Sequence, residues 1–272
     1  MKYKWCVCDM DGTLLNSKGL ISDENENALK GLSNKGVEII IATGRTDLMI
    51  QKYIKQLDLN GHIICCNGGL IRNLSTNEII YSKTIENENV FQILKYCFNK
   101  NVDFLFYTED AIYSNENNPR IKILKENNSS IKIELICDDI LKNINEYKVL
   151  KILIVNDNHE EIKEIEKYFS KKYNVEVVSS YKGLLDIMAT NITKGNALKF
   201  LSEKLHVELE HVIAFGDGFN DYDMLQNVGM PIAVSNAADL LKNTAKYVTT
   251  SNEESGVAFA INNYILKFLE ID

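Results

Sequence analysis

The sequence predicts an α/β protein built on a doubly wound, mainly parallel sheet, and two observations lead to this class. Short apolar runs recur along the chain, several of them ending in Gly, Asp, Thr or Asn: WCVC, VEIIIATGR, HIICCNGG, HVIAFGDG and MPIAV. Continuous apolar strands are typical of a parallel sheet that is covered on both faces. Helical segments lie between these runs, and this alternation of strand and helix predicts the doubly wound arrangement.

Five segments are expected to form the helices of this Rossmann-like core: residues 23–35, 46–57, 220–228, 236–244 and 256–269. The first of them follows Ser22, and a serine at this place can cap a helix by accepting a hydrogen bond from a free backbone N–H. It is followed by Gly36, and glycine commonly ends helices.

Residues 83–189 have a different pattern. The runs VDFLFYT and AIYS predict a hairpin, VLKILIV predicts a strand, and VEVVSS and LLDIMA predict a pair of strands. Between them, HEEIKEIEKYFSKKY places Ile162 and Ile165 at helical spacing among charged residues. We therefore predict a core domain made of residues 1–82 and 190–272, with residues 83–189 inserted as an α+β domain of antiparallel character.

The composition narrows the class of protein. The 272 residues carry a formal net charge of −8 and are 45% hydrophobic and 25% charged, which is ordinary for a globular protein. A surface for nucleic acid or an anionic membrane needs a basic footprint, so we expect neither partner. No apolar run approaches the ~20 residues of a membrane helix. The six cysteines include no CxxC pair, and we expect them to be reduced core thiols in a cytoplasmic protein.

Polar residues follow the predicted strands at the points where the strands end. Ligands of open α/β sheets bind beyond the carboxyl ends of the strands. The residues that the core places there are Asp9, Asp11, Thr43, Arg45, Asn67, Asp217, Asn220 and Asp221, and Lys194 opens the helix that precedes the strand HVIAF. We expect these carboxylates, the hydroxyl and the lysine to converge on one small volume.

This set of side chains suits the transfer of a phosphoryl group. Clustered carboxylates without histidine form an oxygen-only site, which favours Mg²⁺ as the cofactor. A carboxylate nucleophile would form an aspartyl-phosphate, and a second aspartate could protonate the departing oxygen and later deprotonate water. A tight turn through Gly12 and Thr13 would re-aim Asp11 at the site, because a simple strand would leave it beside Asp9.

The segments DMDGT, TGR, TKG and GDGFND occur in this order along the chain. Together they resemble the four motifs of the haloacid dehalogenase superfamily, and their arrangement is most similar to that of its Cof-type sugar-phosphate phosphatases. The resemblance implies that Asp9 is the nucleophile and a Mg²⁺ ligand. It also implies that Asp11 is the general acid and base and offers its backbone carbonyl to the metal, and that Asp217 is the third protein ligand.

The same resemblance assigns roles to the remaining site residues. Thr43 and Lys194 would bind the phosphoryl oxygens, and Asn220 would contact the phosphoryl group or Lys194. Asp221 would support the metal site without binding the ion itself. The insertion lies between Thr43 and Lys194, where members of the family carry a lid that closes over small phosphorylated metabolites. The implied reaction is therefore the hydrolysis of such a metabolite, a sugar phosphate above all. We expect a monomer or a homodimer.

Structural interpretations stay open for several of these residues. Asp217 and Asp221 could cap a helix and interact with its dipole. Thr43 could likewise cap the helix that follows it, and Lys194 taken alone could be a surface lysine. Arg45 is interpreted as bracing its loop rather than contacting the substrate.

Two other functions fit parts of the pattern. A phosphomutase of the same superfamily shares this lid class, but it holds a second phosphate, usually with several arginines, and the insertion contains only Arg120. A signalling receiver domain also gathers aspartates, threonine, lysine and Mg²⁺ on a doubly wound sheet. Its aspartates are adjacent on strand one and its phosphoacceptor lies on a later strand, unlike Asp9 and Asp11. In the insertion, Tyr107 and Tyr113 could contact a leaving group, although packing roles explain them as well.

Overall fold

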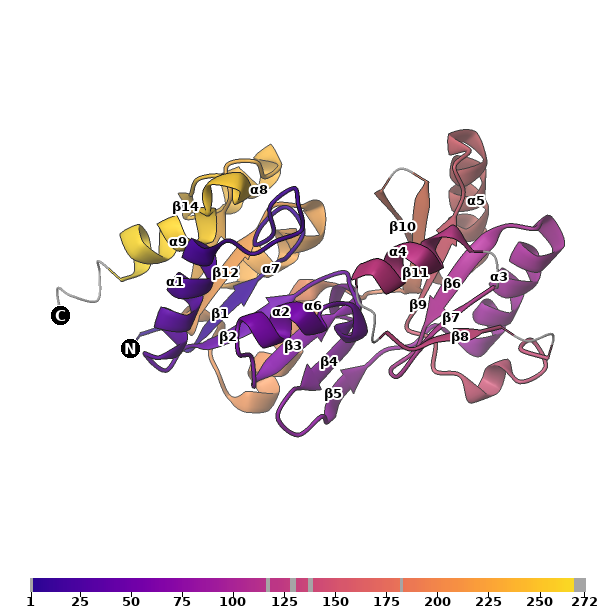
Figure 1. The fold of residues 1–272 in the computed structure, drawn as a ribbon, viewed down its shortest axis with the longest axis horizontal. Helices are drawn as coiled ribbons and strands as arrows, with labels where there is room; N and C mark the ends of the chain where they lie inside the picture. Colours follow the sequence, from indigo (N-terminus) through magenta and orange to yellow (C-terminus); the bar gives the residue numbers. More distant parts are fainter. Residues whose placement is uncertain (1, 116–117, 128–130, 137–138, 182, 267–272) are drawn as a thin grey trace. The chain divides into compact units, whose positions relative to one another are not determined.

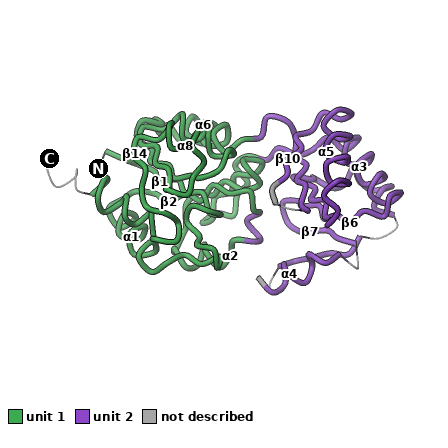
Figure 2. Tube along the Cα trace, turned by 90° about the horizontal axis from the view of Figure 1, so that it is seen from above, with its two compact units in different colours: residues 1–45, 50–81, 193–272 green, residues 46–49, 82–192 purple. Residues whose placement is uncertain are grey.

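The structure, a computed structural model, describes residues 2–115, 118–127, 131–136, 139–181 and 183–266. The chain divides into two compact units (Figure 2): residues 1–45, 50–81 and 193–272 form the first, and residues 46–49 and 82–192 form the second. The second unit therefore begins one residue before the predicted insertion and ends three residues after it. Residues 46–49, which were expected in the core, group with the second unit.

The first unit is built on an eight-stranded sheet with the order β14-β13-β12-β1-β2-β3-β4-β5 (Figure 1). Its strands are β1 (Trp5–Cys8), β2 (Glu38–Ala42), β3 (His62–Cys65), β4 (Leu70–Asn73), β5 (Ile79–Ser82), β12 (Val212–Gly216), β13 (Met230–Ala233) and β14 (Tyr247–Val248). The pairs from β14 through β3 are parallel, and β4 pairs antiparallel with β3. The predicted α/β class with a mainly parallel sheet is confirmed. The sequence-based prediction did not include β4 and β5.

Strand β1 occupies an inner position of the sheet because all four of its side chains are apolar and buried. It pairs with β12 on one side and with β2 on the other. Its last residue, Cys8, lies opposite Phe215 of β12 and Ile41 of β2. Because the three strands are parallel and in step, the residues that follow them leave the same edge of the sheet.

Helices cover both faces of this sheet (Figure 1). They are α1 (Asp23–Ser33), α2 (Gln51–Gln56), α6 (Lys194–Leu205), α7 (Tyr222–Asn227), α8 (Asp239–Thr244) and α9 (Gly256–Ala260). Side chains of α6, α7 and α8 pack in one apolar cluster with Trp5 and Val7 of β1. On the opposite face α1 packs against α9. Helices on both faces confirm the doubly wound arrangement.

The prediction of one continuous helix over residues 46–57 is wrong. Asp47–Met49 form a 3₁₀ helix, and α2 begins only at Gln51, after Ile50 has left the helical region with φ −108° and ψ 9°. Met49 packs in the apolar core of the second unit, whereas Tyr53 is buried in the first. The break at Ile50 therefore falls where the chain passes from the second unit to the first.

Four further helices differ from their predicted limits at the ends. Helix α1 ends at Ser33 rather than at residue 35. Helix α7 begins at Tyr222 after a 3₁₀ turn, and α8 begins at Asp239 rather than at 236. Helix α9 continues as a π-helical segment over Ile261–Ile265. Residues 267–269 of the predicted C-terminal helix lie outside the described residues.

The second unit contains a six-stranded sheet with the order β10-β11-β9-β6-β7-β8. Its strands are β6 (Asp103–Tyr107), β7 (Ile112–Ser114), β8 (Ile133–Leu135), β9 (Lys151–Val155), β10 (Val175–Tyr181) and β11 (Leu184–Ala189), and its helices are α3 (Asn87–Lys100), α4 (Pro119–Asn127) and α5 (His159–Lys172). The pairs β6–β7, β6–β9, β9–β11 and β10–β11 are antiparallel. This pattern confirms the antiparallel α+β character, with the hairpin and the strand pair that the sequence predicts.

The two tyrosines singled out in the insertion are packing residues. Tyr107 is 2% exposed in an apolar cluster with Leu105 and Leu153. Tyr113 stacks on Phe106 with a distance of 4.6 Å between the ring centroids. Both aromatic rings therefore stabilise the second unit.

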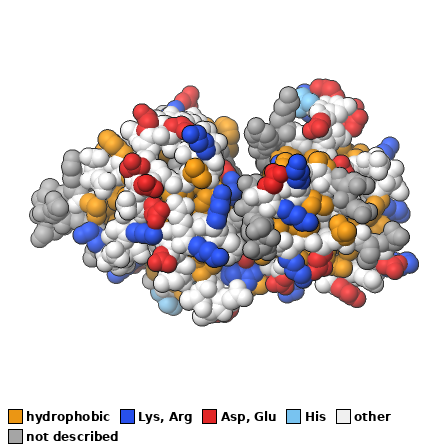
Figure 3. Space-filling model, viewed as in Figure 1, with side chains coloured by type: hydrophobic (Ala, Val, Ile, Leu, Met, Phe, Trp, Pro, Cys, Tyr) orange, Lys and Arg blue, Asp and Glu red, His pale blue; other side chains and the backbone are white. Residues whose placement is uncertain are grey.

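The described surface carries charges of both signs. Figure 3 shows Lys and Arg side chains interspersed with Asp and Glu side chains over the visible face of each unit. Within the described ranges, no helix is both long enough and apolar enough to cross a membrane.

Candidate active site

The carboxyl ends of β1, β12 and β2 bring residues from distant parts of the chain to one edge of the sheet. Asp9 follows β1, and its backbone N–H donates to the Phe215 carbonyl of β12 at 3.1 Å. Thr43 follows β2, and its N–H donates to the Ile64 carbonyl of β3 at 2.9 Å. Asp217 follows β12. The sheet register thus places the predicted nucleophile beside the predicted metal ligand.

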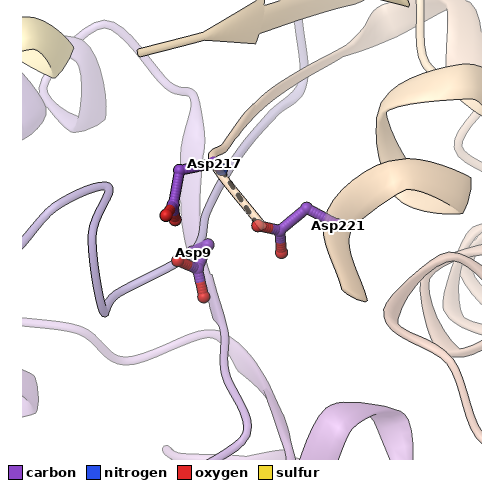
Figure 4. A group of neighbouring side chains, drawn as sticks. All are labelled: Asp9, Asp217 and Asp221. Atoms are coloured by element: carbon purple, nitrogen blue, oxygen red, sulfur yellow. Dashed lines mark hydrogen bonds between the residues drawn. The ribbon is translucent and has the colours of Figure 1, made fainter. Parts of the chain in front are cut away.

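Three of the predicted aspartates form an acidic cluster in the structure (Figure 4). Asp9, Asp217 and Asp221 each offer a carboxylate oxygen, and these oxygens lie within 4.8 Å of one another. Asp9 is 5% exposed and Asp221 is fully buried. Buried like charges repel strongly. The cluster therefore needs compensating positive charge.

Lys194 supplies part of this charge. It is the first residue of α6, and Thr193 caps the helix by accepting a hydrogen bond from a backbone N–H at 3.0 Å. The Lys194 Nζ donates to Asp9 Oδ1 at 2.5 Å and to Asp221 Oδ1 at 2.6 Å, and the side chain is fully buried. Burial opposes its charged form, but Asp221 and Asp9 outweigh burial and raise the pKa of Lys194. The interpretation of Lys194 as a surface lysine is wrong.

One ammonium group does not balance three carboxylates. Burial raises the pKa of Asp9 well above its usual range and Asp221 raises it further, whereas Lys194 opposes this shift. Burial and Asp221 also raise the pKa of Asp217. The ionised forms of Asp9 and Asp217 are thus destabilised, and both side chains offer oxygen donors only. Such a pair fits a hard divalent cation such as Mg²⁺. Asp9 and Asp217 are the residues that would hold it.

Asp221 already uses both of its oxygens within the protein. Its Oδ1 binds Lys194, and its Oδ2 accepts hydrogen bonds from the N–H groups of Asp217 and Gly218, each at 3.0 Å. These bonds fix the loop that carries Asp217 and the ammonium that faces Asp9. The contacts suit the supporting role predicted for Asp221.

The turn after Asp9 fits closely against Asp217. Gly12 has φ +85°, and a Cβ at this position would lie only 2.8 Å from Asp217 Cγ. Thr13 donates its hydroxyl to Asp217 Oδ1 at 2.8 Å. Glycine is required here both for its backbone angle and for its lack of a side chain. The turn therefore positions Asp217 as well as Asp11, a role that the sequence did not indicate.

Asp11 lies outside the acidic cluster. Arg45 binds its carboxylate with two hydrogen bonds, from Nε to Oδ2 at 2.8 Å and from Nη2 to Oδ1 at 2.5 Å. The Asp11 side chain is 58% exposed. The bracing role predicted for Arg45 thus takes the form of an ion pair with the predicted general acid.

Thr43 and Asn220 lie at the same edge of the sheet. Thr43 is fully buried, and its Oγ1 accepts a hydrogen bond from the Arg45 N–H at 3.1 Å. Asn220 is exposed, and its Nδ2 donates to Asn67 Oδ1 at 3.2 Å. Sequence reasoning placed Asn67 at a strand end without giving it a role. The feature of the sequence that could have indicated a role for Asn67 is the segment NGG directly after β3.

Comparisons with known proteins find relatives that cover almost the whole chain. Residues 6–261 match the family model of the haloacid dehalogenase-like hydrolases. The chain is 30% identical to the 5-amino-6-(5-phospho-D-ribitylamino)uracil phosphatase YcsE of Bacillus subtilis, over 97% of this chain and 96% of that protein. A haloacid dehalogenase-like hydrolase from Bacteroides thetaiotaomicron has a similar structure, with a TM-score of 0.87 and 32% identity over 96% of this chain and 98% of that one. A subclass IIB sugar phosphatase of the same superfamily superposes with a TM-score of 0.76 and 25% identity, over 96% of this chain and 98% of that one.

The fold of this chain is thus shared with hydrolases of this superfamily over almost its whole length. The chain belongs to the haloacid dehalogenase-like hydrolase family, and the resemblance inferred from the four motifs is confirmed. The enzyme class that these relatives support is a phosphatase.

Proposed function

We propose that this protein hydrolyses small phosphorylated metabolites, sugar phosphates in particular, with Mg²⁺ and through an aspartyl-phosphate on Asp9. One observation carries the proposal: a buried lysine bridges Asp9 and Asp221 while Asp217 lies within 4.8 Å of both carboxylates. Such an arrangement is costly for a structural site, because several buried charges must be held together. It suits a site that must bind a cation and an anionic phosphoryl group.

Asp9 would act as the nucleophile. One of its carboxylate oxygens would attack phosphorus, and the bond from phosphorus to the departing oxygen would break. Lys194 holds the Asp9 carboxylate in a fixed orientation from the first turn of α6. A Mg²⁺ held by Asp9, Asp217 and the Asp11 carbonyl would offset the negative charge of the carboxylates and of the phosphoryl oxygens. Thr43 and Asn220 would donate to the remaining phosphoryl oxygens.

Asp11 would supply the proton transfers. It would protonate the departing oxygen in the first step and would deprotonate the attacking water in the second. In the structure its carboxylate is bound to Arg45 at the rim of the site. A general acid must reach the departing oxygen at hydrogen-bond distance, so Asp11 has to leave Arg45 during the cycle.

The relatives and the chain itself both support the proposed substrate class. YcsE carries the name of a phosphatase for a phosphorylated ribitylamino uracil, and the subclass IIB neighbour is described as a sugar phosphatase. None of the five described cysteines forms a disulfide, which supports the proposed cytoplasmic setting, where such metabolites occur. The insertion would serve as the lid that selects among them.

An assay with an aryl phosphate and Mg²⁺ tests the reaction. The wild type is expected to release phosphate over many turnovers, and Asp9→Asn is expected to abolish release. A panel of sugar phosphates, nucleotides and pyridoxal phosphate then tests the substrate class, and equal activity across the panel would refute the preference for sugar phosphates. Isomerised substrate without free phosphate would favour a phosphomutase, and phosphorylation without turnover would favour a receiver domain.

A further inference from the structure

We propose that Asn67 is a positioning residue for phosphoryl transfer, which holds the Asn220 amide against the loop that carries Thr43. The inference rests on the proposed function, because it assigns Asn67 to the same site. It concerns a side chain that belongs to none of the four motifs and lies in the turn between β3 and β4. Three independent observations on this turn support it.

The first observation is the backbone conformation. Cys66, Asn67 and Gly68 follow one another with φ values of +52°, +55° and +104°. Residues other than glycine adopt such left-handed angles at a cost in free energy, although asparagine tolerates them better than most. Strain of this kind persists where the surrounding structure imposes it, and it concentrates at functional sites. The strain at two successive residues therefore indicates that this turn has a functional role.

The second observation is where the turn is anchored. The Asn67 N–H donates to the Thr43 carbonyl and the Cys66 N–H donates to the Arg45 carbonyl, each at 2.9 Å. On its other side, Gly68 approaches the backbone of Thr193 so closely that a Cβ would overlap it. Thr193 caps the helix that begins with Lys194. The turn thus joins the phosphoryl-binding loop to the start of α6.

The third observation is the position of the Asn67 side chain. Its Oδ1 accepts the hydrogen bond from Asn220 Nδ2 at 3.2 Å. The same amide packs on the backbone at Gly44, where an added Cβ would lie 3.0 Å from Asn67 Oδ1. An exposed asparagine has a freely rotating amide, and a fixed acceptor selects one of its orientations. Asn67 therefore orients Asn220 next to the loop that carries Thr43.

The substitution Asn67→Gly isolates the side chain. Glycine adopts the left-handed backbone without strain and keeps the N–H that bonds Thr43, so the variant is expected to unfold at a temperature no lower than that of the wild type. With an aryl phosphate and Mg²⁺, we expect KM to rise about fivefold, the effect of one lost hydrogen bond, while kcat changes less.

Asn77→Gly is the matched control. Asn77 also has a left-handed backbone, with φ +59°, and its Oδ1 accepts a hydrogen bond from Arg72 at 3.0 Å. This variant relieves the same backbone strain in the same unit without touching the site, so its KM is expected to equal that of the wild type. An equal rise in KM for both variants would overturn the proposal.

A double-mutant cycle tests whether Asn67 acts through Asn220. Against an Asn220→Ala background, Asn67→Gly is expected to raise KM no further, because the side chain that it orients is gone. Full additivity of the two effects would overturn the proposed coupling. A purely structural role of Asn67 would give the same rise in both backgrounds.

Binding of inorganic phosphate in the presence of Mg²⁺, measured by calorimetry, separates this inference from the proposed function. Asn67→Gly is expected to weaken binding about fivefold relative to the wild type and Asn77→Gly. Phosphate binding with this difference but without turnover of any substrate would refute the proposed hydrolysis and would leave only the orientation of Asn220 by Asn67 at a phosphate-binding site. Equal affinities for the wild type and Asn67→Gly would overturn the inference alone, and an absence of phosphate binding by the wild type would overturn both.

Discussion

Replacing Lys194 with methionine removes the positive charge at the centre of the site and keeps much of the side chain's length. Lys194 is fully buried and binds Asp9 and Asp221 at 2.5 and 2.6 Å. Breaking a buried ion pair by removing one partner costs about 3–5 kcal/mol, because a charge is left buried without compensation. We expect Lys194→Met to lose about this much of its free energy of unfolding near neutral pH, together with all detectable hydrolysis.

The pH dependence follows from the directions of the shifts. The pKa of Lys194 is raised, so its stabilisation is fully present below the ordinary lysine pKa and is lost only as the pH rises through the folded-state value. Near neutral pH the whole contribution is therefore at stake. The pKa of Asp9 is also raised, so Asp9 takes up a proton readily on acidification. The penalty of Lys194→Met should therefore shrink at mildly acidic pH.

Urea denaturation at neutral and at mildly acidic pH measures this penalty. Lys199 is an exposed lysine on the same helix, and Lys199→Met is the matched control, with an expected change below about 0.5 kcal/mol. If both variants unfolded at the same urea concentration at neutral pH, the buried charge cluster would not be the organising feature of the site.

Three further predictions follow from the site and its frame. Mg²⁺ should raise the thermal unfolding temperature near neutral pH, and it should raise it less in acid, because the carboxyls with raised pKa values then bind protons instead. Asp217→Asn should reduce this rise in unfolding temperature. A rise that the substitution leaves unchanged would argue against a metal site at Asp217. Gly12→Ala should lower kcat at least about tenfold by displacing Asp217. Gly19 also has a positive φ, but a Cβ there would meet only Tyr53 Oη at 3.8 Å, so Gly19→Ala should stay active in the same assay. Glu38 accepts hydrogen bonds from the backbone and ring of His62, each at 2.7 Å, and although burial opposes ionisation these bonds lower the pKa of Glu38. At a pH above the ordinary carboxyl pKa, Glu38→Gln should lower the free energy of unfolding by about 1–2 kcal/mol. A urea titration that finds the same loss at a pH well below that pKa would contradict the lowered pKa of Glu38.

The sheet and the acidic cluster could be predicted from the sequence because both depend on short-range patterns. Apolar runs such as that of β1 identify buried strands, and the residue after each run must emerge at the sheet edge. Asp9 and Asp217 were therefore predictable as neighbours although more than half of the chain separates them. The break at Ile50 was not predictable, because it depends on the two cores that bury the residues on either side of it.

The contacts between loops also could not be predicted from the sequence. The ion pair of Arg45 with Asp11 and the hydrogen bond of Asn220 with Asn67 depend on side-chain orientations that no periodicity encodes. Helix α3, by contrast, has its buried residues Val90, Ile93, Leu94 and Cys97 at helical spacing. Its pattern was present in the sequence and was not assigned.

The covalent step on Asp9 is tested most directly by acid-quenching the Asp11→Asn variant during turnover of an aryl phosphate with Mg²⁺. An aryl oxide departs without a general acid, whereas the second step lacks its base, so the phosphorylated enzyme should accumulate. Mass spectrometry is expected to locate one phosphoryl group on the peptide that contains Asp9, and none when Asp9→Asn is added. A phosphoryl group on any other residue, or hydrolysis by Asp9→Asn at the wild-type rate, would contradict the assignment of Asp9 as the nucleophile.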